Sequence, residues 1–343
     1  MRVRGLWLFI LTCALLLSPE QDAYCGKGGH YTPGVAGIRD FTMPQKSGLY
    51  YAQYSPYYYT DGYYGSSGKK IKTLDVDRVI YIDHTPIHVT SVANIDIKVQ
   101  SIGVSPLFFY VFDKNFLGAK YGIMLGTYFG YVKTRIKADI AGSTGGIELP
   151  GEEIKTSVDI DDTAYGMGDI SFSPLWLDWS REHYEVWFSY GFYAPAGKYS
   201  SGKITNIGRG FWSHEMALGI AYYPRKDRAT ALIANLAYEI NQKQRSTDTT
   251  SGQNIALEYG VSQYFTPRFE AGFSGYSSFQ VTRDHGGTIY TDGPNSYTHA
   301  MGGQCSYWIA KGKACLLGKY LYEYAARERT RGGLATINFY YIF

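Results

Sequence analysis

Apolar and polar residues alternate one by one along many short segments of this chain, and this pattern restricts its possible folds more than any other feature. In the segments 184–194, 230–241 and 255–262, every second residue is aromatic or aliphatic, and the residues between are mostly Gly, Ala, Ser, Asn and Glu. A period of two places the two kinds of residue on opposite faces of a β-strand. The polar face of a soluble sandwich meets bulk water and would carry many Lys and Arg. Small polar residues instead favour strands that separate lipid from a narrow, wet lumen.

The composition agrees with a β-rich chain. Among 343 residues there are 34 Tyr, 17 Phe and 40 Gly, and only 18% are charged. These proportions exclude a disordered chain, a coiled coil and a collagen. The net charge of +3 is small and dispersed, so we expect no nucleic-acid partner.

The amino-terminal residues predict export. Two arginines in the first five residues precede an uncharged apolar run, Leu6–Ser18, which is the arrangement of a secretory signal peptide. We place the signal peptide at residues 1–23. We expect no lipid attachment at Cys25, because the three residues before it lack the small, aliphatic pattern. No later run is long enough for a transmembrane helix.

Extending the alternation over the whole chain predicts about 12 strands. They lie near 48–60, 87–113, 121–141, 167–179, 184–195, 211–223, 229–241, 254–265, 268–283, 296–309, 314–326 and 334–343. The connections between them alternate short and long, the long ones being 61–86, 142–166, 196–210, 242–253, 284–295 and 327–333. An even strand number with such sorted connections is typical of outer-membrane barrels. The sequence therefore predicts an all-β fold, a transmembrane antiparallel outer-membrane β-barrel over residues 48–343, in the cell outer membrane of a Gram-negative bacterium.

The last strand and the third strand indicate what surrounds such a barrel. A closing strand that alternates up to a terminal phenylalanine resembles the signal recognised by the barrel-assembly machinery; its residues are Ile337, Phe339, Tyr341 and Phe343. Lys133, Arg135 and Lys137 alternate at the outer end of the third strand. They could bind lipopolysaccharide phosphates or merely border the lipid-facing band. The expected partners are thus outer-membrane lipid, lipopolysaccharide, the assembly machinery and a small-molecule solute.

Four stretches carry a resemblance to one family. They are GGHYTPG from Gly28, PQKSGLYYAQY from Pro44, GMGDISFSPLWLDW from Gly166 and GFYAPAGKY from Gly191. Together they resemble the outer-membrane family labelled MetA-pathway of phenol degradation. The resemblance implies a barrel associated with uptake of aromatic or other apolar compounds. The chain departs from the family mainly in its long 61–86 segment and in its lysine-rich third strand.

No residue pattern predicts an active site, a metal site or a cofactor. The seven histidines are scattered without ligand spacing. The adjacent pairs Asp83-His84 and Asp284-His285 fall in predicted loops. Ser213-His214-Glu215 invites comparison with a lipase. Neighbouring residues on an extended chain point to opposite faces, so none of these sets forms a catalytic contact within itself. We expect no enzyme.

Polar residues with the parity of the lumen face are candidates for lining a channel. They are Asp96, Lys98, Gln100, Asp169, Ser171, Ser173, Glu185, Glu215, Glu239, Glu258, Glu270, Lys319 and Glu323. Twelve strands enclose more room than eight and less than a general porin. We therefore expect an outer-membrane channel for passive uptake of small, aromatic or apolar solutes. The alternatives are a structural or adhesive barrel, and an outer-membrane enzyme.

Residues 24–47 precede the first predicted strand. Four glycines and two prolines exclude a long helix there. The stretch nevertheless carries more apolar side chains than a free periplasmic tail needs. We expect it to fold back into the periplasmic mouth as a short plug, with His30, Tyr31 and Phe41 as plug candidates. A lid on the outside of the turns is the alternative.

Overall fold

The structure, a computed structural model, describes residues 28–82, 85–146, 149–286 and 295–343. The predicted signal peptide, residues 1–23, lies outside the described residues. Tyr24, Cys25 and Asp83 also lie outside them. No helix among the described residues is long and apolar enough to cross a membrane.

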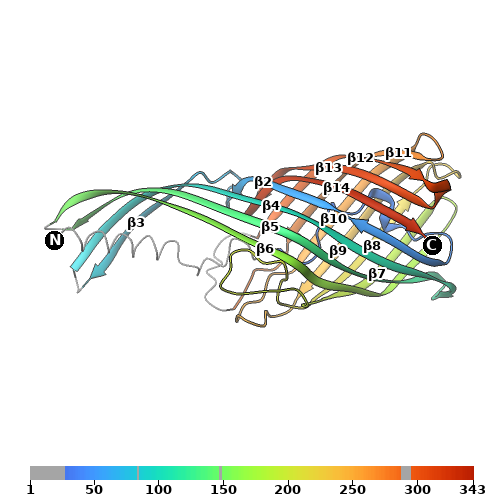
Figure 1. Ribbon diagram of the computed structural model, residues 1–343, viewed down its shortest axis with the longest axis horizontal. Coiled ribbons are helices and arrows are strands. Elements are labelled where there is room, and N and C mark those ends of the chain that lie inside the picture. The colour runs from blue at the N-terminus through green and yellow to red at the C-terminus, as the bar shows by residue number, and fades with distance from the viewer. Residues whose placement is uncertain (1–27, 83–84, 147–148, 287–294) are drawn as a thin grey trace.

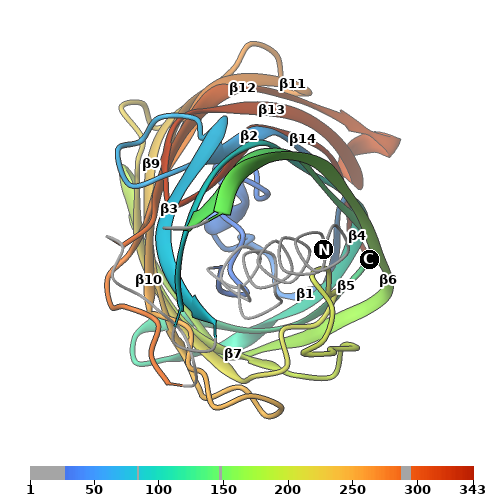
Figure 2. The same cartoon turned by 90° about the vertical axis from the view of Figure 1, so that its left-hand side faces the viewer.

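The chain forms one large antiparallel sheet that closes on itself (Figures 1 and 2). Its strands are β1 (Gly48–Tyr54), β2 (Pro56–Tyr64), β3 (Thr73–Ile82), β4 (Thr85–Phe116), β5 (Ala119–Gly146), β6 (Leu149–Ser180), β7 (Tyr184–Ala194), β8 (Ser213–Tyr222), β9 (Thr230–Asn241), β10 (Asn254–Tyr264), β11 (Phe269–Gln280), β12 (Tyr297–Ile309), β13 (Ala314–Arg327) and β14 (Arg329–Ile342). Two short 3-10 helices accompany them, η1 (Ile38–Phe41) and η2 (Ala310–Gly312).

The barrel closes between its first and last strands. β1 and β2 are one strand interrupted at Ser55, and both pair with β14 on one side and with β4 on the other. Counted in this way the barrel has 12 strands, with β3 attached outside it along β4. The predicted fold class, a 12-stranded transmembrane barrel, is confirmed.

The outward face of the barrel is apolar. Leu218, Leu236 and Leu257 lie side by side on β8, β9 and β10, and each is 39–54% exposed. Their chain neighbours Ala217, Ala237 and Ala256 point inward and are buried. Such a band of exposed leucines meets lipid, and the alternation within each strand fixes which face that is.

Two of the predicted long connections are strands. The segment 61–86 contains the end of β2 and all of β3, and the segment 142–166 contains the end of β5 and the first half of β6. β4 has 32 residues, roughly 105 Å at 3.3 Å per residue, whereas a lipid-facing band is about 25 Å tall. Strands this long continue beyond the membrane into water, where one face no longer meets lipid and the alternation therefore changes. The prediction that 61–86 and 142–166 are loops was wrong for this reason.

The surplus length forms a sheet beyond the barrel, which we call the extension. It comprises β3 and the parts 85–99 of β4, 132–146 of β5 and 149–163 of β6. The extension projects from the end opposite the carboxyl terminus (Figure 1). A third predicted long connection, 327–333, is instead a tight turn at Glu328, whose φ is 52°.

Candidate functional site

The residues before β1 run through the interior of the barrel. This stretch, residues 28–47, is called the inner segment, and it appears as the blue chain inside the ring of strands in Figure 2. It contacts side chains of β6, β9, β10, β12, β13 and β14. It reaches Ser213 at the far end of β8, well beyond the short-turn mouth, and it does not lie across the outside of the turns.

One end of the inner segment is fixed at His30. Its Nε2 lies 2.8 Å from Asp169 Oδ2, and its Nδ1 lies 2.7 Å from Ser213 Oγ. Its backbone N–H donates to Glu239 Oε1 over 2.6 Å. The ring stacks on Tyr193 with centroids 4.8 Å apart. A Cβ at the preceding Gly29 would lie 1.9 Å from Glu239 Oε2, so a larger residue there would displace the carboxylate that binds His30.

The middle of the inner segment is held by its main chain. Glu258 accepts the N–H of Gly34 over 2.8 Å and also the hydroxyl of Tyr31. From the other side, Lys319 Nζ donates to the carbonyl of Ala36 over 2.6 Å, and Asn338 Nδ2 donates to that of Val35 over 3.0 Å. A chain with little secondary structure of its own must satisfy its buried backbone groups elsewhere. Here the barrel wall supplies those partners, several of them charged and therefore strong.

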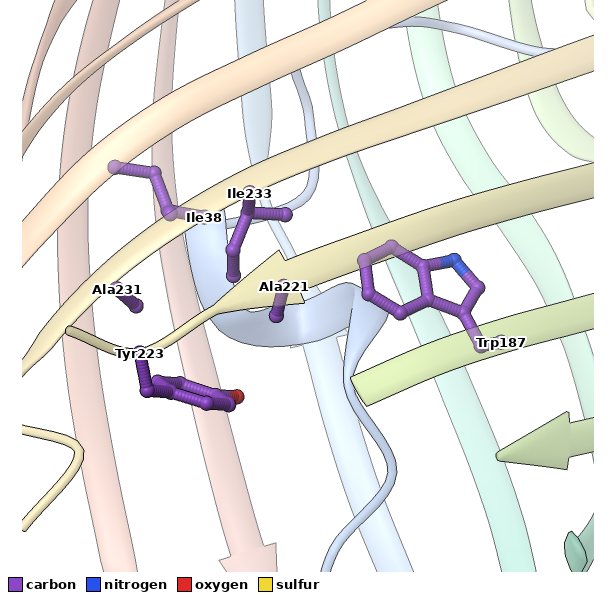
Figure 3. Packing of buried hydrophobic residues seen from close by; sticks show 6 residues of the cluster. All are labelled: Ile38, Trp187, Ala221, Tyr223, Ala231 and Ile233. Atoms are coloured by element: carbon purple, nitrogen blue, oxygen red, sulfur yellow. The ribbon is translucent and has the colours of Figure 1, made fainter. Parts of the chain in front are cut away.

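The other end of the inner segment is packed through η1. Ile38 is 3% exposed and lies among Trp187, Ala221, Tyr223, Ala231 and Ile233 (Figure 3). Phe41 stacks on Trp187 with an interplanar angle of 6°. Arg39 Nε lies 2.5 Å from Glu270 Oε1. The void beside Ile38 and Lys319 measures about 10 Å³, which is room for about one water molecule.

Most of the predicted lining residues face the interior. Ser171 and Ser173 lie against the inward-facing Gly126 and Gly191. The charged members are buried or nearly so: Asp169, Glu185, Glu215, Glu239, Glu258, Glu270, Lys319 and Glu323. The aromatic residues Tyr128, Trp187, Tyr223 and Tyr264 share this face. The interior is thus acidic with aromatic patches.

Three predicted lining residues do not face the lumen. Asp96, Lys98 and Gln100 lie on the same face of β4 as Ile102 and Val104, which are 56% and 40% exposed. The prediction assumed that the polar face is always the inner one. That rule fails for Asp96 and Lys98 because they belong to the extension, where the outer face meets water; Gln100 lies on the same outer face at the border of the extension.

Sequence reasoning missed several interior residues that bind the inner segment. Besides Ser213 and Asn338, Gln304 accepts the backbone N–H of Ile38 over 3.0 Å. Gln304 alternates with outward-facing Cys305 on β12, and Asn338 alternates with Ile337 and Phe339 on β14. Strand parity could therefore have identified both amides, but not their partner.

His30, Ser213 and Asp169 resemble a catalytic triad in composition only. Ser213 is fully buried, and its hydroxyl donates to Asn241 Oδ1 over 2.6 Å. The imidazole lies between Asp169 and Glu239, which leaves no place for a substrate beside the hydroxyl. His214 points the other way and contacts Tyr190. Over the described ranges, no group of three or more His, Cys, Asp or Glu side chains could hold a metal ion.

The other residues named from the sequence, and the two cysteines of the strands, lie as follows. His84 lies outside the described residues, and Asp284 Oδ1 accepts the N–H of Gly252. Cys305 is exposed and Cys315 is buried, and both are free thiols. The plug candidates His30, Tyr31 and Phe41 all belong to the inner segment. Ile337 and Phe343 of the carboxyl-terminal pattern are 67% and 63% exposed.

Comparison with known proteins places this geometry in context. Residues 86–339 match the model of a family described as MetA-pathway of phenol degradation. The fold is similar to the crystal structure of the COG4313 outer membrane channel from Pseudomonas putida F1. The TM-score is 0.62 at 12% identity, over 92% of this chain and 100% of that one. A Pseudomonas aeruginosa FadL homologue is similar more distantly, with a TM-score of 0.36 at 10% identity over 85% and 89% of the two chains. No curated protein matches the chain in sequence.

Proposed function

We propose that this chain, which belongs to the family described as MetA-pathway of phenol degradation, is an outer-membrane channel for passive uptake of small aromatic or other apolar solutes. We propose the outer membrane of a Gram-negative bacterium as its location, with lipid and lipopolysaccharide around it. The carboxyl-terminal residues would engage the barrel-assembly machinery during insertion.

One observation carries the proposal. Many side chains of the wall, among them Glu258, Gln304, Lys319 and Asn338, hydrogen-bond to the inner segment. The carboxyl-terminal end of the segment continues directly into β1. Displacing it would therefore leave an opening between the walls of a 12-stranded barrel, which has more room than the filled interior of an eight-stranded one. The inner segment acts, in this proposal, as a plug.

The lining indicates what such an opening would admit. Carboxylates outnumber cationic groups among the interior side chains, and a low-dielectric passage lined by one sign of charge disfavours ions of that sign. Trp187, Tyr223 and Tyr264 offer ring surface beside these carboxylates. Neutral solutes with an aromatic or apolar body should therefore pass more readily than anions.

Deleting residues 25–42 tests both the channel and the plug. In planar bilayers, the deletion should raise single-channel conductance, and in liposomes it should speed the entry of phenol. Unchanged conductance and unchanged phenol entry would refute the plug. An intact protein that passes no more phenol or sugar than empty liposomes would refute the channel.

A matched pair of substitutions separates plug release from general damage. Glu239→Gln removes the charge that binds the backbone N–H groups of His30 and Tyr31, so open events should become more frequent. Asp284→Asn makes the same kind of change at another buried carboxylate, but Asp284 accepts a backbone N–H outside the inner segment, that of Gly252. It should leave the frequency of open events unchanged. Equal effects of both substitutions would contradict the plug.

The extension supports the alternative of an adhesive barrel, because it projects beyond the closed ring of strands (Figure 1). The flux assay separates this function from transport. An enzyme is a weaker alternative. Ser213→Ala and His214→Ala should leave the lipolytic activity of the purified protein at background.

A further inference from the structure

Two segments at one end of the barrel carry an excess of positive charge. β14 begins at Arg329 and runs towards the carboxyl terminus, so its start lies at the opposite end, where the extension leaves the barrel (Figure 1). The end of β2 lies beside it, because Arg329 and Arg331 pair with Tyr64 and Gly62. We call this end of the barrel, residues 61–72 and 324–331, the rim. Its charged residues are Lys69, Lys70, Lys72, Arg327, Arg329 and Arg331 against Asp61 and Glu328.

The last arginine of the rim faces away from the lumen. On β13, Glu323 is buried inside the barrel, whereas Tyr322 and Tyr324 on either side of it are 38% and 45% exposed. Arg331 lies against these outward residues: its Nη1 donates to the carbonyl of Tyr324 over 3.2 Å, and its guanidinium lies 5.8 Å from the centre of the Tyr322 ring. Arg329 is the exception, because it lies 3.8 Å from the buried Glu323.

Arg327 is fixed in place with one side of its guanidinium open. Ala326 and Thr298 are buried, so Arg327 and its cross-strand partner Tyr297 face outward. The guanidinium lies 4.8 Å from the centre of the Tyr297 ring. Its Nε and Nη2 donate to the carbonyl of Asn295 over 3.1 and 2.9 Å. Nη1 is not buried and has no partner among the described residues, so it is available to a ligand.

The turn between β2 and β3 adds lysines to the same surface. A Cβ at Gly68 of this turn would lie 3.4 Å from Tyr297 Oη, so the turn lies beside the ring that supports the guanidinium. Lys70 is exposed, and its Nζ donates to the backbone carbonyl of Asp61. The carboxylate of Asp61 lies 3.1 Å from Arg331 Nη2. That carboxylate therefore neutralises the arginine, and the lysine has no carboxylate of its own.

The rim differs in this respect from the other cationic surface of the strands. The three cations of β5 that the sequence offers for lipopolysaccharide each lie 2.8–3.6 Å from an aspartate of β6. Such exposed pairs satisfy their own charges. At the rim, Lys69 and Lys72 are exposed and have no ion-pair partner within the described part of the chain. The unbalanced positive charge of the outer surface is therefore found at the rim.

The rim also lies at the outer edge of the lipid-facing band. A transmembrane β-strand takes about 9–11 residues. Counted back from Ile342 at the end of β14, that length ends near Gly333, which pairs with Tyr322. Exposed tyrosines at this level are expected where an aromatic belt meets the membrane–water interface. The arginines that precede Gly333 therefore lie at the level of the lipid headgroups.

We propose that the rim binds the phosphate groups of lipopolysaccharide, with Arg327 as the central contact and Lys70 and Arg331 beside it. The inference rests on the proposed outer-membrane location and names the lipid partner and its site. A guanidinium binds phosphate oxygens through charge-assisted hydrogen bonds of fixed geometry. A ring and a carbonyl already hold that of Arg327, so little conformational entropy is lost when it binds. The exposed faces of Tyr322 and Tyr324 lie beside the acyl chains.

Binding of defined lipids to the full-length protein tests the rim. The protein is purified in a non-ionic detergent and titrated with lipid A that carries two phosphates, and bound lipid is counted by native mass spectrometry. Lys70→Gln/Arg327→Gln should weaken this binding at least about tenfold, because charge-assisted hydrogen bonds to phosphate are lost. Lipid A without phosphates should bind the unaltered protein as weakly as the double variant binds lipid A with both phosphates.

Arg225→Gln/Lys226→Gln is the matched control. It removes the same two charges from an exposed turn after β8, at the other end of the barrel, where these side chains are 71% and 75% exposed. Its affinity for lipid A should equal that of the unaltered protein. A shift in gel mobility on heating shows that each variant is a folded barrel before the titration.

Each other outcome overturns the rim site. Equal losses in both double variants would reduce the binding to general attraction between charges, and equal affinity for lipid A without phosphates would assign it to the acyl chains. Equal binding of phosphatidylglycerol would assign the rim to phospholipid, and displacement of lipid A by inorganic phosphate would assign it to the free ion. Location is measured separately by membrane fractionation. Recovery of the protein in the inner membrane would refute the outer-membrane proposal, whereas an outer-membrane protein that binds no lipid A would refute the rim site alone.

Discussion

Replacing Arg39 by methionine tests what holds the inner segment in the barrel. Besides its 2.5 Å contact with Glu270, Arg39 donates to Ser262 Oγ over 3.1 Å and to the carbonyl of Ala229 over 3.0 Å. Its guanidinium lies 4.8 Å from the centre of the Tyr264 ring. The Glu270 side chain is only 5% exposed, so loss of Arg39 leaves a buried carboxylate whose remaining side-chain donor is Ser306.

The expected magnitude follows from this burial. Removing one partner of a buried ion pair costs about 3–5 kcal/mol, because the other charge stays uncompensated. Removing both partners, as in Arg39→Met/Glu270→Leu, should cost only about 2 kcal/mol, the value of the two further hydrogen bonds of Arg39. The double variant should therefore cost about 1–3 kcal/mol less than Arg39→Met alone, and the coupling energy in a double-mutant cycle should be at least that large.

Hydrogen exchange of the inner-segment amides in liposomes measures this directly, since local opening has its own free energy. The N–H groups of Gly34 and Ile38 are hydrogen-bonded to the wall, and they should exchange at least about 100-fold faster in Arg39→Met. The double variant should recover much of the protection. Arg268→Met, on an exposed turn, is the control. Additive effects of the two single substitutions would refute the reasoning, because they would mean that Arg39 and Glu270 hold the segment independently.

Three further predictions concern the lipid face, pH and topology. Leu236→Arg should lower the free energy of unfolding in liposomes by about 2–4 kcal/mol, as for a cation near the bilayer midplane, and Thr230→Arg at the strand end by about 0–1 kcal/mol; equal costs would contradict the midplane position of Leu236. Burial raises the pKa of Asp40 by more than its hydrogen bonds with Tyr340 and Gly37 lower it. Docking of the inner segment should therefore be tightest below the usual aspartate titration range and should weaken as pH rises through the raised pKa. In Asp40→Asn, the hydrogen-exchange protection of the inner segment should no longer depend on pH. A pH dependence that persists in Asp40→Asn would exclude Asp40 as its cause. Protease added to intact cells should cleave within 242–253 and spare 224–228, and external cleavage at 224–228 would reverse the orientation.

The alternation in the sequence was sufficient to predict the barrel and the direction of most interior side chains. Glu185 and Trp187 point inward and Tyr184 and Phe188 outward because successive residues of a strand must face opposite sides. The face of a strand that meets lipid is apolar and the face that meets the crowded lumen is small or polar, so the same alternation identifies each strand in turn. Cys305, which is exposed, and Cys315, which is buried, lie on opposite faces for the same reason.

The tertiary structure decided where that pattern stops and what fills the interior. Asp96 and Lys98 alternate as regularly as any lumen residue, but beyond the lipid the faces of β4 are set by water on one side and by the neighbouring isoleucines on the other. Which face of the extension meets water depends on the length of the strands and on their pairing, and neither property can be read from a few neighbouring residues. The path of the inner segment is likewise invisible in residues 28–47, because its main chain is bound by Glu239, Glu258, Lys319 and Asn338, which lie about 200 to 300 positions away along the chain. These side chains surround the inner segment only once the barrel has closed. Because they bind its backbone groups, which every residue has, the sequence of the segment carries no sign of them.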